Sequence, residues 1–92
     1  MIVSFSHKGL EKFFKTGSTA GIQVKHKDRL SRILFALENA KTAQDMNVAS
    51  YNFHSLKGDK KELYSVKVNG NWRITFTFID GNAYVVDYQD YH

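Results

Sequence analysis

The sequence ends in three side chains that commonly carry enzyme chemistry: a carboxylate, a phenol and an imidazole. A histidine and a lysine three residues apart, and an arginine after the single tryptophan, add another proton carrier and two cations. RNA can be cut by its own 2′-hydroxyl, which needs a base, cations for the developing phosphate charge and an acid for the departing 5′-oxygen. These groups meet that need without a metal or a cofactor. The candidates are His54, Lys57, Arg73, Asp90, Tyr91 and His92.

Each of these residues also has a simpler interpretation. Arg73 could clamp a phosphate through its planar fork, or it could form an ion pair with an acid on a neighbouring strand, such as Asp87. Lys57 lies in a basic turn, and exposed basic turns need no function. His92 could be a frayed chain end. The combination of these signals, rather than any one of them, favours a site.

The four histidines divide into two kinds. Because imidazole titrates near neutrality, His54 and His92 are the candidates for proton transfer. His7 and His26 lie at or near the expected starts of helices, so we expect both at the surface. No closely spaced ligand motif of the HExxH kind occurs, so we predict no metal site.

The charge of the chain is unevenly distributed. The net charge is +4, and residues 1–41 hold eight of the basic residues against three acidic ones. A basic half attracts polyanions and makes their binding depend on salt, although lysine-rich helices also occur simply because they keep a protein soluble. The cations of this half that could contact nucleic acid are Lys8, Lys12, Lys15, Lys25, Lys27, Arg29 and Arg32.

Length and composition predict one globular domain over residues 1–92. Apolar residues make up 42% and aromatic residues 14%, which is enough for a core and too much for a disordered chain. There is no cysteine, which excludes disulfides, thiolate zinc sites and a cysteine nucleophile. No long apolar run or signal peptide is visible, so we expect a cytoplasmic protein without a membrane partner.

Hydrophobic periodicity predicts two helices in the first half. Leu10, Phe13 and Phe14 form a stripe at helical spacing, after Ser6 as the expected N-cap and before Gly17 as a left-handed C-cap. Residues 1–5 suit a short strand, and a helical turn is expected over 42–46. A longer helical pattern covers residues 24–40, with an apolar face made of Leu30, Ile33, Leu34, Leu37 and Ala40.

The second half changes to the alternation of strands. Three strands are expected over residues 63–68, 71–78 and 82–89, joined by turns at Asn69-Gly70 and Asp80-Gly81. In the last strand Tyr84, Val86 and Tyr88 are expected on one face. Residues 51–61 are expected to be a loop that folds over one edge of the sheet.

The parity of these strands separates a core face from a polar face. Trp72 shares the parity of the apolar residues in its strand, so we expect it in the core, and Tyr91 and Phe53 are left as candidates for stacking on a base. Arg73 and the threonines that follow it have the opposite parity. The predicted fold class is therefore α+β, with N-terminal helices packed on one face of a curved antiparallel sheet.

Short motifs along the whole chain carry a family resemblance. They are Ser4-Phe5, His7-Lys8-Gly9-Leu10, His54-Ser55-Leu56-Lys57-Gly58-Asp59, Ser65-Val66, Asn71-Trp72-Arg73-Ile74-Thr75-Phe76, Asp87-Tyr88 and Asp90-Tyr91-His92. In their order and spacing the chain resembles the HigB-type toxins of the RelE superfamily, the toxic halves of bacterial toxin–antitoxin pairs. The resemblance implies a microbial-RNase-like fold and ribosome-dependent cutting of translated mRNA in the decoding site, which inhibits translation.

The resemblance also implies roles for the candidate residues. Lys57 and Arg73 would stabilise the phosphate charge, and His92 would transfer a proton with His54 assisting or positioning. Tyr91 would pack or hydrogen-bond at the nucleotide, and the last acid, Asp90, would orient a neighbour such as the terminal histidine. Which group is the base and which the acid stays open, because members of the superfamily divide this work differently.

Three kinds of partner follow from the same resemblance. They are a HigA-like helix-turn-helix antitoxin, the ribosome with its mRNA, and operator DNA reached only through the toxin–antitoxin complex. The basic helices of the first half would then meet ribosomal RNA. No cofactor is implied.

Two rival functions remain on the sequence alone. A gyrase-poisoning toxin of the ParE type would share the fold, but those toxins lack this set of groups, so His54, Lys57, Arg73 and His92 together argue against it. A non-enzymatic module that binds RNA or an antitoxin is the second rival. Variants at Arg73 and His92 that still arrest growth would favour it.

Overall fold

The computed structural model describes residues 1–57 and 62–91, and for Lys57 and Glu62 it describes only the backbone. The helices are α1 (Lys8–Thr16) and α2 (Lys27–Asn39), with shorter 3-10 turns η1 (Val24–His26), η2 (Ala43–Met46) and η3 (Ala49–Tyr51). The strands are β1 (His54–Lys57), β2 (Glu62–Asn69), β3 (Trp72–Ile79) and β4 (Asn82–Asp90). Their order in the sheet is β1-β2-β3-β4, and each neighbouring pair is antiparallel. The predicted α+β class is confirmed.

Helix α1 begins one residue later than the sequence predicted. His7, rather than Ser6, is the N-cap, because its Nδ1 accepts a hydrogen bond from the Leu10 amide at 3.0 Å. Gly17 closes the helix with φ of 81°, as predicted. Near its start the helix backbone touches another backbone, since a Cβ on Gly9 would meet the Gly21 oxygen at 2.5 Å. Only glycine fits at this contact.

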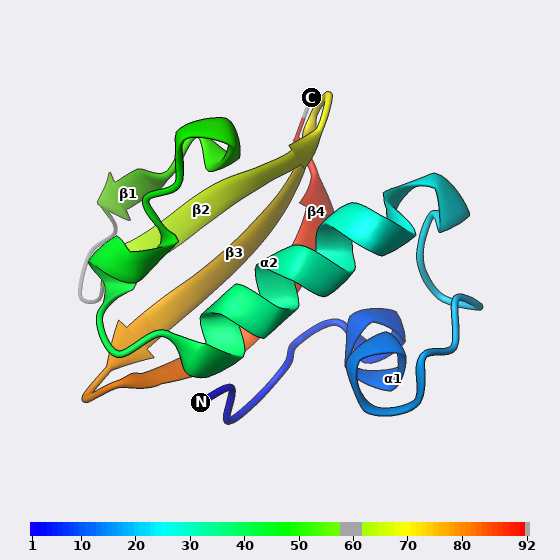
Figure 1. Ribbon diagram of the computed structural model, residues 1–92, viewed down its shortest axis with the longest axis horizontal. Helices are drawn as coiled ribbons and strands as arrows, with labels where there is room; N and C mark the ends of the chain where they lie inside the picture. The colour runs from blue at the N-terminus through cyan, green and yellow to red at the C-terminus, as the bar shows by residue number, and fades with distance from the viewer. Residues whose placement is uncertain (58–61, 92) are drawn as a thin grey trace.

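Helix α2 supplies the centre of the core. The predicted apolar face is confirmed, because Leu30, Ile33, Leu34 and Leu37 are all buried. The expected helical turn over 42–46 is also present as η2, where Thr42 and Asp45 form a capping box. Figure 1 shows α2 lying across the sheet with α1 beside it, so both helices cover the same face.

The sheet gives one face to the helices, and no helix of the described residues covers the other. Val66, Ile74, Phe76 and Val86 pack against α2 in one core cluster, and Trp72 packs against its edge as predicted. The alternate residues of these strands lie on the second face, which we call the open face. The two-layer arrangement therefore leaves a sheet surface on which functional groups can stand.

Two β-bulges decide which residues share a face. One lies between Lys67 and Asn69, and the other opposite the segment from Thr75 to Thr77. The second bulge contains Val85, whose φ is 47°. Because a shift of one residue moves every following side chain to the other face, the bulges set the composition of the open face.

The structure corrects the sequence-based expectations at three places. Residues 1–5 do not form a regular strand, although Ile2 and Phe5 make isolated parallel bridges to β4. The expected loop over 51–61 contains the short edge strand β1. Tyr84 pairs with Thr77 on the open face, so it does not share the core face of Val86, because the bulge at Val85 intervenes.

Candidate active site

Cross-strand pairing arranges the open face in rows. One row joins four strands, from His54 through Ser65 and Thr75 to Asp87, and the next joins Lys67, Arg73 and Gln89. Neighbouring strands are about 5 Å apart and neighbouring rows about 7 Å apart. The sheet therefore brings His54 and Arg73, two of the predicted site residues, onto one surface.

His54 is exposed on the edge strand and its ring is oriented by the backbone. Its Nδ1 lies 2.8 Å from the carbonyl oxygen of Asn52. Because a carbonyl only accepts, Nδ1 carries the proton in this contact, and Nε2 of the neutral ring bears the lone pair. Asn52 itself has φ of 48°, a left-handed conformation that asparagine tolerates. The exposed ring thus offers Nε2 as a proton acceptor.

Arg73 is half-buried beside the β2–β3 turn. Its Nη1 donates hydrogen bonds to the carbonyl oxygens of Gly70 at 3.1 Å and Trp72 at 3.4 Å. The alternative pairing with Asp87 is not observed. That carboxylate instead accepts hydrogen bonds from the Gln89 side-chain amide at 2.7 Å and the Tyr88 backbone amide at 2.9 Å. Among the described residues the guanidinium has no acidic partner. Its charge is therefore available to an anion on the open face.

The predicted residues at the chain end are described only in part. The backbone of Tyr91 is tied to the β2–β3 turn, because its amide donates to the Asn71 carbonyl at 2.8 Å, and its side chain is exposed. Asp90 pairs with Trp72, so its register position is not that of Arg73, which pairs with Gln89. His92 lies outside the described residues, and its predicted role stays a prediction.

Lys57 is placed by its backbone alone. It is the last residue of β1 and pairs with Glu62 at the start of β2. His54 pairs with Ser65 at the other end of the same short strand. His54 and Lys57 therefore share one strand but have opposite parity, so the register does not place Lys57 in the open-face rows, and its predicted contact with phosphate stays a prediction.

The open face also holds polar residues that are not among the six predicted catalytic residues. Thr75 is only 2% exposed, and its Oγ1 accepts from the Gln89 side-chain amide at 3.2 Å. Ser65 is buried beside it in the same row. Lys67 stands opposite Arg73. The alternation of residues 63–68 already separates Ser65 and Lys67 from the apolar face, but the pairing of Lys67 with Arg73 depends on the bulge in β2.

His26 contradicts the expectation of a surface histidine. It is 1% exposed, and its Nδ1 lies 2.6 Å from the Tyr88 hydroxyl. The rings of Trp72 and Tyr88 pack edge-on against it. Burial and the charge of Lys25 lower the pKa of His26, and burial raises the pKa of Tyr88. This cluster lies on the helix side of the sheet and braces the C-terminal part of β4.

The predicted nucleic-acid cations are spread over the helical layer. Lys8, Lys12 and Lys15 belong to α1, and Lys15 pairs with Glu11 at 2.8 Å. Arg29 is used internally: it donates to the carbonyls of Ser50 and Lys67 and lies over the Tyr51 ring. Its guanidinium thus fastens α2 to η3 and β2. The other cations on this layer are Lys25, Lys27 and Arg32.

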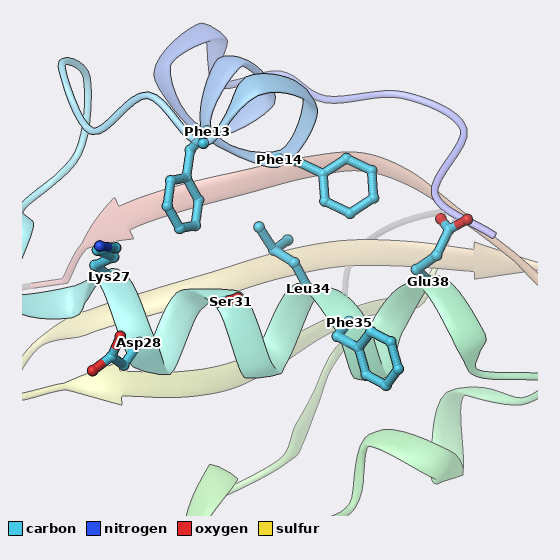
Figure 2. A pocket seen from close by; sticks show the side chains of 9 residues that line it. Phe13, Phe14, Lys27, Asp28, Ser31, Leu34, Phe35 and Glu38 are labelled. Carbon is cyan, nitrogen blue, oxygen red and sulfur yellow. The ribbon is translucent and has the colours of Figure 1, made fainter.

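A pocket of about 400 Å³ lies between the two helices. Figure 2 shows Phe13 and Phe14 of α1 above Leu34 and Phe35 of α2, with Glu38 at one end. Of the predicted catalytic residues whose side chains the structure describes, none lines it. Within the described ranges no cluster of three metal-ligating side chains occurs, and no helix there is long and apolar enough to cross a membrane.

Comparison with known proteins identifies the class and then the family. The fold, two helices on one face of a small antiparallel sheet, agrees with the RelE-like toxins. A model described as the RelE-like toxin of the type II toxin–antitoxin system, HigB, matches residues 3–92, so the chain belongs to this HigB family. It is 45% identical over 92 residues to the endoribonuclease HigB of Proteus vulgaris, and the match covers all of both chains. The resemblance drawn from the sequence is confirmed.

Proposed function

We propose that this endoribonuclease cuts messenger RNA in the decoding site of the ribosome and thereby inhibits translation. Support for RNA cutting comes from the family and from the full-length likeness to an enzyme named as an endoribonuclease. The observation that carries the chemistry is the open face, on which His54 offers Nε2 and Arg73 has no acidic partner among the described residues. These are an acid–base group and a phosphate-binding cation on one surface.

The cleavage proceeds through the 2′-hydroxyl of the message. A base removes the proton of that hydroxyl, its oxygen attacks the adjacent phosphorus, and an acid protonates the departing 5′-oxygen. Arg73 and Lys57 stabilise the added negative charge on the phosphate. His92 transfers a proton with His54 assisting, Tyr91 contacts the nucleotide, and the adjacent Asp90 orients the terminal imidazole.

The helical layer supplies the contact with ribosomal RNA. Its exposed lysines lie on α1, η1 and the start of α2, away from the open face. Lysines on such a surface attract the phosphate backbone at long range, with an affinity that falls as salt rises. Arg29 is left out of this surface because its guanidinium contacts Ser50, Lys67 and Tyr51.

As the toxin of a type II system, the protein has an antitoxin as its partner. We infer that this antitoxin is a small helix-turn-helix protein of the HigA kind, and that the complex of the two binds its own operator. A short reading frame next to the toxin gene, coding for such a protein, would support this. Operator binding by the purified toxin alone would contradict it.

Mapping mRNA 5′ ends after brief induction tests the proposed function. Cutting in the decoding site predicts new ends in register with codons, lost in the Arg73→Gln variant. Purified toxin should cut mRNA in programmed ribosomes much faster than the same RNA free in solution. Equal rates on free and ribosome-bound RNA would contradict ribosome dependence, and accumulation of broken DNA without RNA ends would favour a topoisomerase target.

A further inference from the structure

Two cations stand opposite each other on the open face, close to the β2–β3 turn. Lys67 of β2 pairs directly with Arg73 of β3. Residues paired in this way have Cβ atoms only about 5 Å apart, and like charges in such positions repel each other. Both residues are partly buried, so water screens them less than it would at an exposed site.

Nothing among the described neighbours neutralises this pair. Gln89, the residue across from Arg73 on β4, is uncharged. Asp87, in the adjacent row, is occupied by the Gln89 side chain and the Tyr88 amide. In the described part of the chain the salt bridge formed is Lys15–Glu11, on the helical layer. The repulsion between Lys67 and Arg73 therefore stands uncompensated within that part.

The backbone holds Lys67 in this position from two sides. Its carbonyl oxygen accepts a hydrogen bond from Nη2 of Arg29 at 3.2 Å, which ties β2 to α2. The β-bulge that follows Lys67 shifts the register so that Val66 meets Ile74 in the core and Lys67 meets Arg73 on the open face. A one-residue slip would place Lys67 on the core side. The fold thus imposes the like-charge pair.

We propose that Lys67 and Arg73 together bind one phosphate of the RNA strand, so that Lys67 is a substrate-binding residue of this site. The inference rests on the proposed function, in that the anion is taken to be the RNA backbone. A phosphate bound between the two cations offsets their repulsion and accepts hydrogen bonds from both. Arg73 contributes its planar fork and Lys67 a mobile point charge. The row that contains His54 lies directly beside this pair.

The test is binding of an RNA that cannot be cut. A tetranucleotide with 2′-O-methyl groups lacks the attacking hydroxyl, and its affinity for the free toxin is measured over a range of salt. We expect Lys67→Gln to weaken binding roughly tenfold, as for loss of a charged hydrogen bond. The slope of log affinity against log salt should change little in Lys67→Gln, because Arg73 still neutralises the shared phosphate, and should fall by about 0.7 when Arg73→Gln is added. Lys67→Arg should restore the affinity, because it keeps the charge.

Two further variants and one further measurement make the result specific. Lys41→Gln, an exposed lysine on the helical side, should leave binding unchanged. Lys67→Gln combined with Arg73→Gln should lose less than the two single losses together, since both residues bind the same phosphate. The melting temperature of Lys67→Gln should equal or exceed that of the unaltered protein, because the change removes a repulsion. A lower melting temperature with unchanged binding would mean a structural role only.

The binding and cutting measurements separate the two proposals. If Lys67→Gln binds the tetranucleotide with unchanged affinity while the unaltered toxin cuts mRNA on ribosomes, the inference is wrong and the proposed function stands. If the unaltered toxin does not cut mRNA on ribosomes but Lys67→Gln loses tetranucleotide binding, the proposed function is wrong and the phosphate site stands.

Discussion

The ring of His54 is oriented by a carbonyl two residues earlier in the chain rather than by an acid. Asn52 reaches that position by adopting a left-handed backbone conformation just before β1. The contact leaves Nε2 as the proton acceptor of the neutral ring. Arg73, in turn, is held by two carbonyls of its own hairpin. Both functional side chains are thus oriented by nearby backbone carbonyls. Neither forms an ion pair with an acidic residue among those the structure describes.

Replacing Arg73 by glutamine should abolish most of the activity without unfolding the protein. We expect the single-turnover rate on programmed ribosomes to fall about 10²–10³-fold, as for loss of a preorganised transition-state contact. Stability should change by no more than about 1 kcal/mol, because the lost hydrogen bonds are partly exposed. The rate of Arg73→Lys should lie between those of Arg73→Gln and the unaltered protein, since lysine keeps the charge and loses the planar fork of the guanidinium. An unchanged rate in Arg73→Gln would contradict the assignment.

His26 should make folding stability depend on pH. The pKa of the buried ring is lowered from its usual 6.5 by burial and by Lys25. The unfolded chain therefore takes up a proton near pH 6.5 that the folded chain does not. Stability is complete above this pH and falls as the pH drops below it, by at most about 1.4 kcal/mol per pH unit for one proton.

Urea unfolding at several pH values between 7.5 and 5.5 measures this dependence. In His26→Gln we expect lower stability at pH 7.5, because the contact with Tyr88 is altered, and a flatter slope toward low pH. His54→Gln, at an exposed histidine, is the matched control and should keep the slope of the unaltered protein. A slope that survives in His26→Gln and vanishes in His54→Gln would contradict this account.

At the scale of the elements, the bulge in β4 has the largest consequence. Tyr84 of β4 pairs with Thr77 and lies on the open face. Without the bulge, regular alternation from Tyr84 onward would turn Asp87 and Gln89 toward α2 and Tyr88 toward the open face. With it, Val86 and Tyr88 pack in the core, and Asp87 and Gln89 stand beside the site. One extra residue in β4 thus turns its apolar side chains toward the core and its polar side chains toward the open face.

Val85 bears the backbone strain of this bulge. Its φ is 47° although valine is β-branched, and its side chain is 48% exposed. The left-handed conformation costs such a residue about 1–2 kcal/mol, whereas asparagine adopts it readily. We therefore expect Val85→Asn to gain about 0.5–1 kcal/mol and to raise the melting temperature by a few degrees.

Thermal unfolding followed by circular dichroism gives the melting temperatures for this comparison. Val3→Asn is the control, because that valine is similarly exposed, at 50%, and does not have a positive φ. It should show no gain. Equal shifts in the two variants would mean that the gain comes from removing an exposed apolar side chain, not from relief of strain.

At the scale of the whole molecule, the two chain ends lie at opposite ends of the sheet. The Met1 amino group donates to the Gly81 carbonyl in the β3–β4 turn, and Tyr91 is bound to Asn71 in the β2–β3 turn. Figure 1 shows the N-terminus and the C-terminal end of β4 far apart. The active-site residues near Arg73 therefore neighbour the C-terminal end and not the N-terminal one.

A tag added after His92 should reduce activity, whereas the same tag before Met1 should not. A tag joined directly to His92 crowds the residue to which proton transfer is assigned and displaces its ring from the message. We expect a loss of about 10²-fold in the single-turnover rate, the lower range for a general acid or base. Equal rates for the two tagged forms would show that the chain end takes no part in catalysis.

Local sequence patterns were sufficient to predict most of the helices and strands and the fold class of this protein. The spacing of Leu30, Ile33 and Leu34 predicted α2, and the two glycine turns predicted the meander, because helix and strand periods are properties of short segments. The α+β class followed from these elements. Residue type and spacing pointed to His54 and Arg73, the family resemblance agreed, and the sheet does place them on one face.

Only tertiary contacts decided the rest. β1 is too short and polar to show a period of its own, and it exists because β2 offers it an edge. His26 is buried because Tyr88, distant in sequence, provides a hydrogen-bonding partner in the core. The bulges arise where regular pairing from the hairpin turn would put apolar side chains on the wrong face of the sheet. One extra residue in the strand returns these side chains to the core. Lys67 consequently faces Arg73, a pairing that no local pattern contains.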